Sequence, residues 1–326
     1  MTLLTKSELG VIEHLLTEAG CVRPQDRCLL LFDESTADLV EGFKMVAAQL
    51  SLSLTLATVP LANRHGTEAP IKVRRQMMEH TLIIALTHFS LAHTQSRLDA
   101  ARCGARFLSM PMYNRAMLAD PCLCFPYRQQ RQTVEAFTQA FNAGKRIQVT
   151  TSIGTDIWLN IDGRQGNCCP GYVSQAGELG SPPDIESNIS PLEYESSGVV
   201  VIDGSITCPE FGLLQSPIWL TVKNGRIVTI QSERADYVTT LERILGPLNS
   251  KRRILAECGV GLNPAASLTG NMLTDEGALG CLHFGFGANS TVGGINNVDF
   301  HLDFVFRNPT LKVDERLLIE NGEILL

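Results

Sequence analysis

The sequence predicts two domains: an α/β domain with a parallel sheet over residues 1–145, and a strand-rich α+β domain over residues 146–326. Three observations lead to this division. A chain of 326 residues exceeds the usual size of one hydrophobic core. In the first part, short apolar runs alternate with helical periodicity, which is typical of strands joined by helices. From about Ile147 onward, short β-like segments follow one another between Gly, Asn, Asp and Pro residues.

The N-terminal elements follow from this periodicity. Residues 27–32 form a short apolar run, and residues 37–50 place apolar side chains three and four positions apart, so we expect a strand and then a helix. The same reasoning predicts strands at 52–59, 81–86 and 105–108 and a helix at 92–103. Such alternation implies a parallel sheet. The residues after the first strand, Asp33-Glu34-Ser35-Thr36, lack the glycines of a dinucleotide fingerprint, so no dinucleotide site is expected.

The C-terminal elements are short β-like runs at residues 149–151, 156–161, 198–202, 218–222 and 226–230. Between the last two runs, Asn224-Gly225 is the residue pair of a tight hairpin. The segment 166–197 contains Pro, Ser and five carboxylates, and it is predicted as a loop. Such a loop usually solvates a surface, although loops also carry functional groups over a scaffold.

Composition excludes several classes of function. The 27 basic and 34 acidic residues give a net charge of −7, whereas nucleic-acid binding would need a basic face, so no nucleic-acid partner is expected. No apolar run is long enough for a membrane span, and the first residues lack the order of a signal peptide, so we expect a cytoplasmic protein without a membrane partner. Ten cysteines are scattered without a CxxC pair, which favours reduced, mostly buried thiols over disulfides or structural zinc.

Four residues of metal-ligand types fall close together near the C-terminus: Glu257, His283, His301 and Asp303. His301 and Asp303 are the sharpest pair, because positions i and i+2 of a strand project from the same face. His283 lies in a second apolar run whose glycines allow close backbone approach. A single histidine in an apolar strand is usually an ordinary core or surface residue. Two histidines and two carboxylates also fit a metal or catalytic site, so the spacing alone leaves both interpretations open.

Several motifs resemble, in order, those of the M29 family of metallopeptidases, the aminopeptidase T type. The first three matches are Pro183-Asp184-Ile185-Glu186 with P-x-G-E, Ser190-Pro191-Leu192-Glu193 with A-P-L-E, and Gly198 to Ser205 with G-x-x-x-x-D-G-S. The next are Glu257 to Pro264 with E-x-G-x-G-x-N-P, Thr274-Asp275-Glu276 with E-D-E, and Gly293 to Asp303 with N-x-x-x-H-x-D. The resemblance runs from about Thr151 to the C-terminus.

The resemblance implies a strand-rich metal-binding catalytic domain whose ligands are Glu186, Glu257, His283, His301 and Asp303. It also implies catalytic roles for Glu186 and Glu257. Such a hydrolase would cleave an N-terminal residue from a small peptide, or a small amide, and would act as a homodimer. Oxygen and nitrogen donors suit two divalent ions such as Zn²⁺, Co²⁺ or Mn²⁺, with Asp303 and Glu257 as candidate bridges. One ligand does not carry over, because Ser290 stands where the family has a Tyr.

A second branch of the same fold gives an alternative function. The 2,5-dihydroxypyridine 5,6-dioxygenases are similar to this chain at Gly287 to Gly294, through G-P-N-T-x-V-G-G, and at His301-Leu302-Asp303. They hold one Fe²⁺ on two histidines and one aspartate, a set suited to oxygen activation. Their first histidine stands where this chain has Glu257, and they lack a counterpart of His283. A third alternative is a non-catalytic binding relative, because a fold does not fix a function.

Overall fold

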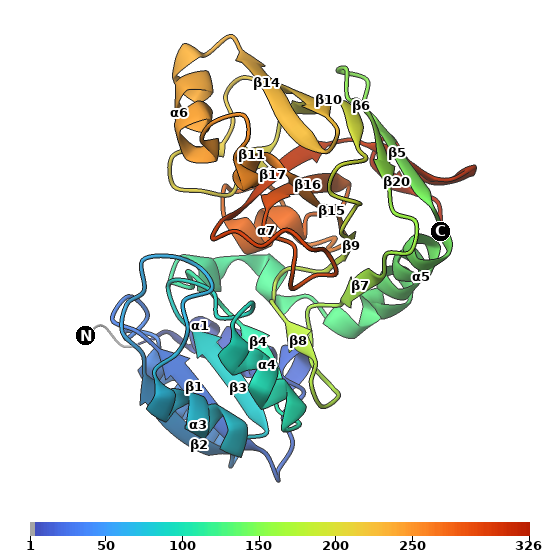
Figure 1. Cartoon of the computed structure of the whole chain (residues 1–326). Coiled ribbons are helices and arrows are strands. Elements are labelled where there is room, and N and C mark those ends of the chain that lie inside the picture. Colours follow the sequence, from blue (N-terminus) through green and yellow to red (C-terminus); the bar gives the residue numbers. More distant parts are fainter. Residues whose placement is uncertain (1–3) are drawn as a thin grey trace. The chain divides into compact units, whose positions relative to one another are not determined.

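The computed structural model describes residues 4–326, which form two compact units (Figure 1). Of the described residues, the first unit contains 4–129 and 171–183, and the second contains 130–170 and 184–326. The sequence predicts one boundary after residue 145, whereas the chain crosses from one unit to the other three times. Among the described residues, no helix combines the length and the apolar character needed to cross a membrane.

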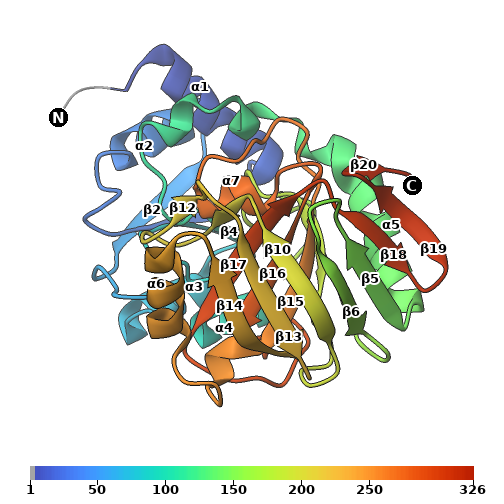
Figure 2. The same cartoon turned by 90° about the horizontal axis from the view of Figure 1, so that it is seen from above.

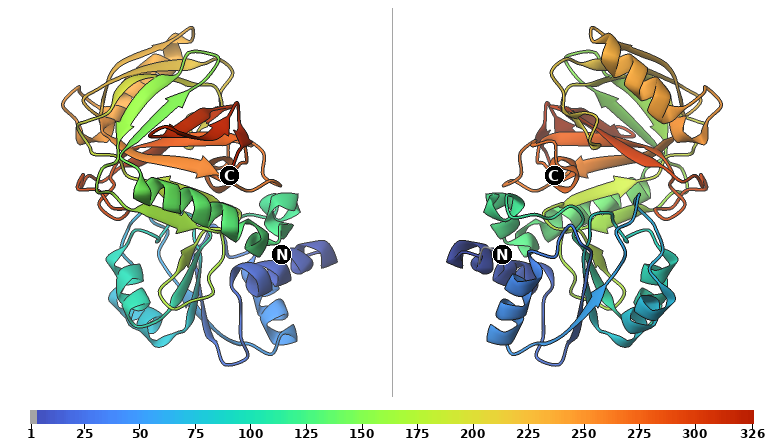
Figure 3. Two further views of the ribbon diagram at one scale, coloured as in Figure 1. Left: turned by 90° about the vertical axis from the view of Figure 1, so that its right-hand side faces the viewer. Right: turned by 90° about the vertical axis from the view of Figure 1, so that its left-hand side faces the viewer.

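The first unit is built around a parallel sheet, as the sequence predicts. Its strands lie in the order β2-β1-β3-β4-β8, with bounds β1 Arg27–Phe32, β2 Ser53–Thr58, β3 Leu82–Leu86, β4 Arg106–Ser109 and β8 Leu179–Gly180. The helices are α1 Lys6–His14, α2 Val40–Gln49, α3 Ile71–Glu79 and α4 Gln95–Arg102. Helices α1 and α2 cover one face and α3 and α4 the other (Figure 3), so the central strand β3 is buried along its whole length.

A buried ion pair lies at one end of this sheet. Arg106 and Asp26 are almost fully buried, and their Nη2 and Oδ2 atoms are 2.5 Å apart. Arg106 Nη1 also donates to the carbonyls of Gly20 and Cys21, at 2.7 and 2.9 Å. Asp26 accepts from Thr81 Oγ1 at 2.8 Å. The pair therefore meets the requirement that buried charges be paired and hydrogen-bonded.

The second unit contains two mainly antiparallel sheets (Figure 2). One has the order β14-β13-β10-β6-β5-β18-β19-β20, and the other has the order β12-β11-β17-β16-β15-β9-β7. The strands of the first sheet are β5 Arg146–Thr150, β6 Asp156–Asn160, β10 Ser197–Ile202, β13 Ile218–Lys223, β14 Arg226–Ser232, β18 Thr310–Val313, β19 Arg316–Glu320 and β20 Glu323–Ile324. Those of the second are β7 Gly166–Cys169, β9 Glu186–Ile189, β11 Ser205–Ile206, β12 Gly212–Leu213, β15 Leu255–Gly261, β16 Cys281–Gly287 and β17 His301–Arg307. The helices are α5 Arg131–Ala143, α6 Ala235–Leu245 and α7 Met272–Glu276.

The predicted hairpin is present between β13 and β14. Asn224 and Gly225 both have positive φ, 49° and 66°, as a two-residue turn of this type requires. Glycine is also needed for space, because a Cβ at Gly225 would lie 1.8 Å from the carbonyl oxygen of Glu193.

The prediction of a loop over residues 166–197 is wrong. This segment supplies strands β7 and β9 to the seven-stranded sheet and β8 to the parallel sheet. Its Pro and Ser residues suggested a loop, but long-range pairing of Glu186–Ile189 with β15 determines the structure. The hydroxyls of Thr138 on α5 and Ser187 on β9 are hydrogen-bonded at 2.8 Å, and Figure 3 shows α5 lying along this edge of the sheet. Glu186 therefore stands on a strand whose four residues are all buried.

Candidate metal centre

The five predicted ligands come from four strands that are neighbours in the seven-stranded sheet, in the order β17, β16, β15 and β9. Strand β17 supplies His301 and Asp303, at positions i and i+2, and each other strand supplies one residue. The intervening residues Leu302, Phe284 and Cys258 point to the opposite face, because side chains alternate along a strand. On that face the aromatic rings of β16 and β17 pack together, with the Phe286 and Phe304 centroids 5.2 Å apart.

Glycines make room for the ligand side chains. Each ligand residue stands opposite a glycine of a neighbouring strand: Glu186 opposite Gly261, Glu257 and Asp303 opposite Gly285, His283 opposite Gly259, and His301 opposite Gly287. A Cβ at Gly259 would lie 2.1 Å from His283 Nε2, and a Cβ at Gly285 would lie 2.7 Å from His301 Nε2. Neither position can carry a larger residue without displacing a ligand.

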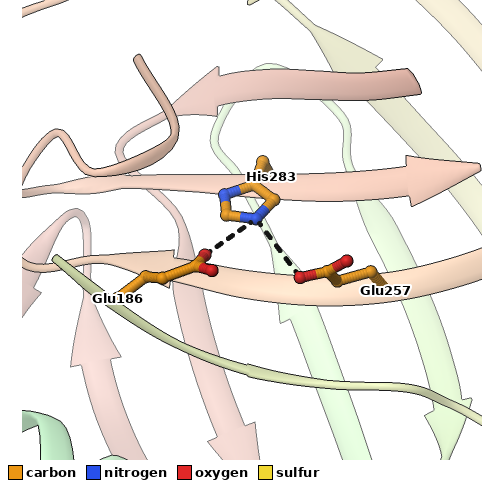
Figure 4. A group of neighbouring side chains, drawn as sticks. All are labelled: Glu186, Glu257 and His283. Atoms are coloured by element: carbon orange, nitrogen blue, oxygen red, sulfur yellow. Dashed lines mark ion pairs between the residues drawn. The ribbon is translucent and has the colours of Figure 1, made fainter. Parts of the chain in front are cut away.

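The first group of possible metal donors contains Glu186, Glu257 and His283, whose ligand atoms lie within 4.8 Å of one another. His283 Nε2 is 3.1 Å from Glu186 Oε2 and 4.0 Å from Glu257 Oε1. Figure 4 shows both carboxylates facing the same nitrogen of the His283 ring. All three residues are buried. This group is therefore closed to bulk solvent.

The second group contains Glu257, His301 and Asp303, again with ligand atoms within 4.8 Å. His301 Nε2 is 3.4 Å from Glu257 Oε2 and 3.2 Å from Asp303 Oδ1. The side chain of His301 is 32% exposed, whereas the two carboxylates are buried. Glu257 thus belongs to both groups, with one oxygen facing each histidine.

The pKa values of these groups reflect their mutual electrostatics. Burial and the neighbouring Glu186 raise the pKa of Glu257 to about 7. Burial alone would lower the pKa of each histidine, but the hydrogen bond to Glu186 and nearby carboxylates raise the pKa of His283 to about 9. Asp303 and Glu257 likewise raise the pKa of His301 to about 10. Burial opposes ionisation of Asp303, yet His301 outweighs it and holds the Asp303 pKa well below its usual range.

Two further acids border the site that sequence reasoning did not assign to it. The carboxyl group of Asp184, two residues before Glu186, is buried, and burial together with Glu186 raises its pKa. Glu276, at the end of α7, is hydrogen-bonded to Asp303, and burial and Asp303 raise the Glu276 pKa. Asp184 lies in the motif from Pro183 to Glu186, and Glu276 lies in the motif from Thr274 to Glu276. These two motifs are the only features of the sequence that point to the two acids.

The donor set fits divalent cations. One oxygen each of Asp184 and Glu276 is buried without a hydrogen-bond partner among residues 4–326, an arrangement that is costly unless something else satisfies these atoms. Five neighbouring carboxylates face only two imidazoles. With all five carboxylates ionised, two divalent ions would balance four of the negative charges. Oxygen and imidazole donors without thiolate suit Zn²⁺, Co²⁺, Mn²⁺ or Fe²⁺.

Comparison with known proteins identifies the family. The family model described as 2,5-dihydroxypyridine 5,6-dioxygenase matches residues 18–326. The chain belongs to this family. A 2,5-dihydroxypyridine 5,6-dioxygenase from Pseudomonas putida is 22% identical over 211 residues, which cover 61% of this chain and 60% of that protein's length.

Two solved structures share the fold. The structure of 2,5-dihydroxypyridine dioxygenase from Pseudomonas putida is similar with a TM-score of 0.84, at 18% identity, over 99% of this chain and 98% of that one. Wild-type AmpT from Thermus thermophilus is similar with a TM-score of 0.70, at 14% identity, over 98% and 100%. The predicted α/β and strand-rich architecture is confirmed. The dioxygenase branch of the predicted resemblance is confirmed as the family, whereas membership of the M29 family stays a prediction.

Proposed function

We propose that this member of the dioxygenase family is a metal-dependent hydrolase that holds two divalent ions and cleaves an N-terminal residue or a small amide. The observation that carries the proposal is the position of Glu257, whose two carboxylate oxygens face different histidines, at 4.0 Å from His283 and 3.4 Å from His301. A single ion would use only one of the two donor groups. Two-ion hydrolytic sites need a carboxylate that spans ions about 3.5–4 Å apart.

The five predicted ligands have different positions and roles in the proposed site. Glu186 and His283 hold its closed end, and Asp303 and His301 hold its open end, with Glu257 between them. The partly exposed His301 marks the side from which a substrate would approach. Glu276 orients Asp303 through their hydrogen bond. Divalent ions bound to these groups would lower the pKa of a water molecule and polarise the substrate carbonyl.

A second candidate function is ring cleavage by dioxygen, and the family match over residues 18–326 favours it. In that case Glu257, His301 and Asp303 would hold one Fe²⁺. This set has one histidine and two carboxylates, whereas the facial triad of non-haem oxygenases has two histidines and one carboxylate. It would also leave Glu186 and His283 without a role. For these reasons we favour the hydrolase.

Metal analysis together with two assays tests the proposal. Metal-free protein would be loaded with Zn²⁺, Mn²⁺, Co²⁺ or, without oxygen, Fe²⁺, and the bound ions counted. Each form would then be given a mixture of short peptides and aminoacyl amides, and separately 2,5-dihydroxypyridine with an oxygen electrode. Two bound ions and amide cleavage without oxygen uptake are expected. One bound iron with oxygen uptake would establish the dioxygenase instead, and a protein that binds no ion would point to the binding relative.

A further inference from the structure

The segment between β16 and β17, residues 288–300, leads directly into His301 and is held by buried polar groups. Asn289 is fully buried, and Asn296 and Glu193 are 4% and 3% exposed. These three residues and Arg164, whose side chain is 10% exposed, form one connected network that we call the clasp. None of the four is among the metal donors, so the network needs another explanation.

Glu193 is the centre of the clasp. Its Oε1 accepts hydrogen bonds from Asn289 Nδ2 at 3.0 Å and from the backbone N–H of Ile295 at 2.7 Å. Its Oε2 forms an ion pair with Arg164 Nη2 at 2.5 Å, and Arg164 also donates to the carbonyl of Gly293. A single buried carboxylate thus ties the two ends of the 289–295 turn to the segment after β9 and to the segment before β7. Charge-assisted hydrogen bonds of this kind are about twice as strong as neutral ones.

The two asparagines complete the attachment. Asn289 Oδ1 accepts from the backbone N–H of Asn296 at 2.8 Å, and Asn296 Nδ2 donates to the carbonyl of Gly287 at 2.6 Å. Gly294 makes room for this arrangement, because a Cβ there would lie 2.0 Å from Asn289 Cγ. The backbone is therefore fixed at Gly287 and at Asn289, on both sides of Ala288.

Ala288 connects the clasp to the metal centre. Its N–H donates to the carbonyl of Phe300 at 2.7 Å, and its carbonyl oxygen is 2.8 Å from Nδ1 of His301. With Nδ1 occupied by this carbonyl, the ring of His301 turns Nε2 toward Glu257 and Asp303. His283 differs, since its buried Nδ1 has no hydrogen-bond partner among residues 4–326. The clasp is therefore connected to His301 and not to His283.

We propose that Glu193 is a positioning residue for His301, acting through Asn289 and the Ala288 carbonyl, so that it supports the open end of the metal centre selectively. The inference deepens the proposed function and rests on it. Partners that orient a ligand histidine typically change metal affinity by about 10–100-fold when they are removed. Loss of the Glu193 charge should therefore lower the affinity for the ion held by His301 and leave the affinity for the ion held by His283 unchanged.

Calorimetric titration of the metal-free protein with Zn²⁺ tests this inference. His301→Ala and His283→Ala would identify which binding event belongs to which end. In Glu193→Gln, the Zn²⁺ binding step that depends on His301 should lose affinity by about 10–100-fold. The binding step that depends on His283 should keep its affinity. The double variant Arg164→Met/Glu193→Gln removes both charges of the pair and should show the same selective weakening as Glu193→Gln. It tests whether an unpaired, buried Arg164 damages the fold in the single variant. Asp26→Asn, at the matched buried ion pair of the first unit, is the control and should leave both events unchanged.

The outcomes separate the two proposals. Wild-type titration in both Glu193 variants, or equal weakening of both events, would overturn the positioning role while leaving the two-ion function intact. If wild-type protein binds one ion only, and that ion needs His301, weakening in Glu193→Gln would still support the clasp while the two-ion hydrolase fails. A protein that binds no Zn²⁺ would overturn both.

Discussion

Each unit buries charged side chains, but the two sets differ in how they are compensated. In the first unit Asp26 and Arg106 form a one-to-one pair whose remaining polar atoms find hydrogen bonds. In the second unit five carboxylates face two imidazoles, and one oxygen each of Asp184 and Glu276 has no partner within the described chain. A balanced set of buried charges serves the fold, whereas an unbalanced one indicates a place for cations. Substitutions in each of the two sets test that distinction.

The largest effect is expected from His301→Ala and Asp303→Ala. Each change should lower turnover by more than the ~10–100-fold typical of groups that only orient a ligand. The fold should remain, because a catalytic metal site on preformed strands contributes less to folding than a structural one. Steady-state rates, circular dichroism and denaturant unfolding measure both properties. Near-native turnover in either variant would remove that residue from the site.

The reverse pattern is expected from Asp26→Ala. Removing Asp26 leaves the Arg106 charge buried without its partner, which should lower the free energy of unfolding by about 3–5 kcal/mol. Metal content per folded molecule should not change, since neither residue belongs to a donor group. Urea titration and elemental analysis check the two parts separately. A loss of metal from the folded variant would contradict the distinction drawn here.

Glu257→His tests the bridging carboxylate. A neutral imidazole cannot span two ions as a carboxylate does, so we expect one ion in place of two and slower hydrolysis. With an imidazole at this position, the open end of the centre would approach the set of two histidines and one aspartate that suits iron. Ion counts in the wild type and the variant, each loaded with Zn²⁺ and with Fe²⁺, provide the measurement. Unchanged stoichiometry and hydrolysis would show that Glu257 lies outside the metal shell.

The smallest effect is a pH dependence of metal binding. The pKa values of His283 and His301 are raised to about 9 and 10, and that of Glu257 to about 7. Ions must displace these protons, so metal affinity should rise between pH 7 and pH 10, with proton release on binding. In metal-free protein the raised histidine pKa values contribute stability that is complete below about pH 6.5 and lost as pH rises through 9 to 10. Calorimetry in buffers of different ionisation enthalpy, and unfolding at pH 7 and 10, measure both trends.

Much of the fold was predictable because its signals are local. The strand β1 and helix α2 follow from apolar periodicity, and the β13–β14 turn follows from Asn224-Gly225. The i and i+2 spacing of His301 and Asp303 correctly placed both on one face of a strand. The residues predicted as ligands do lie together, while their roles stay predictions.

The remainder depends on contacts that the sequence does not encode locally. Glu186 was placed on a loop, because its partner strand β15 begins 69 residues after it and nothing nearby indicates that pairing. The return of residues 171–183 to the first unit is equally long-range. Apart from the motifs that contain them, Asp184 and Glu276 carry no local sign of a buried site, and long-range contacts bring them beside the predicted ligands.

The glycines opposite the ligands have one more consequence. The space that the two histidine rings occupy is created by missing side chains at Gly259 and Gly285. The room for the ligands and the ligands themselves therefore depend on separate positions of the sequence. A ligand residue can be exchanged while the glycine opposite it stays, whereas a single added methyl group at Gly259 or Gly285 would displace a histidine ring although every ligand residue is still present. This separation would let the donor set change without a redesign of the sheet.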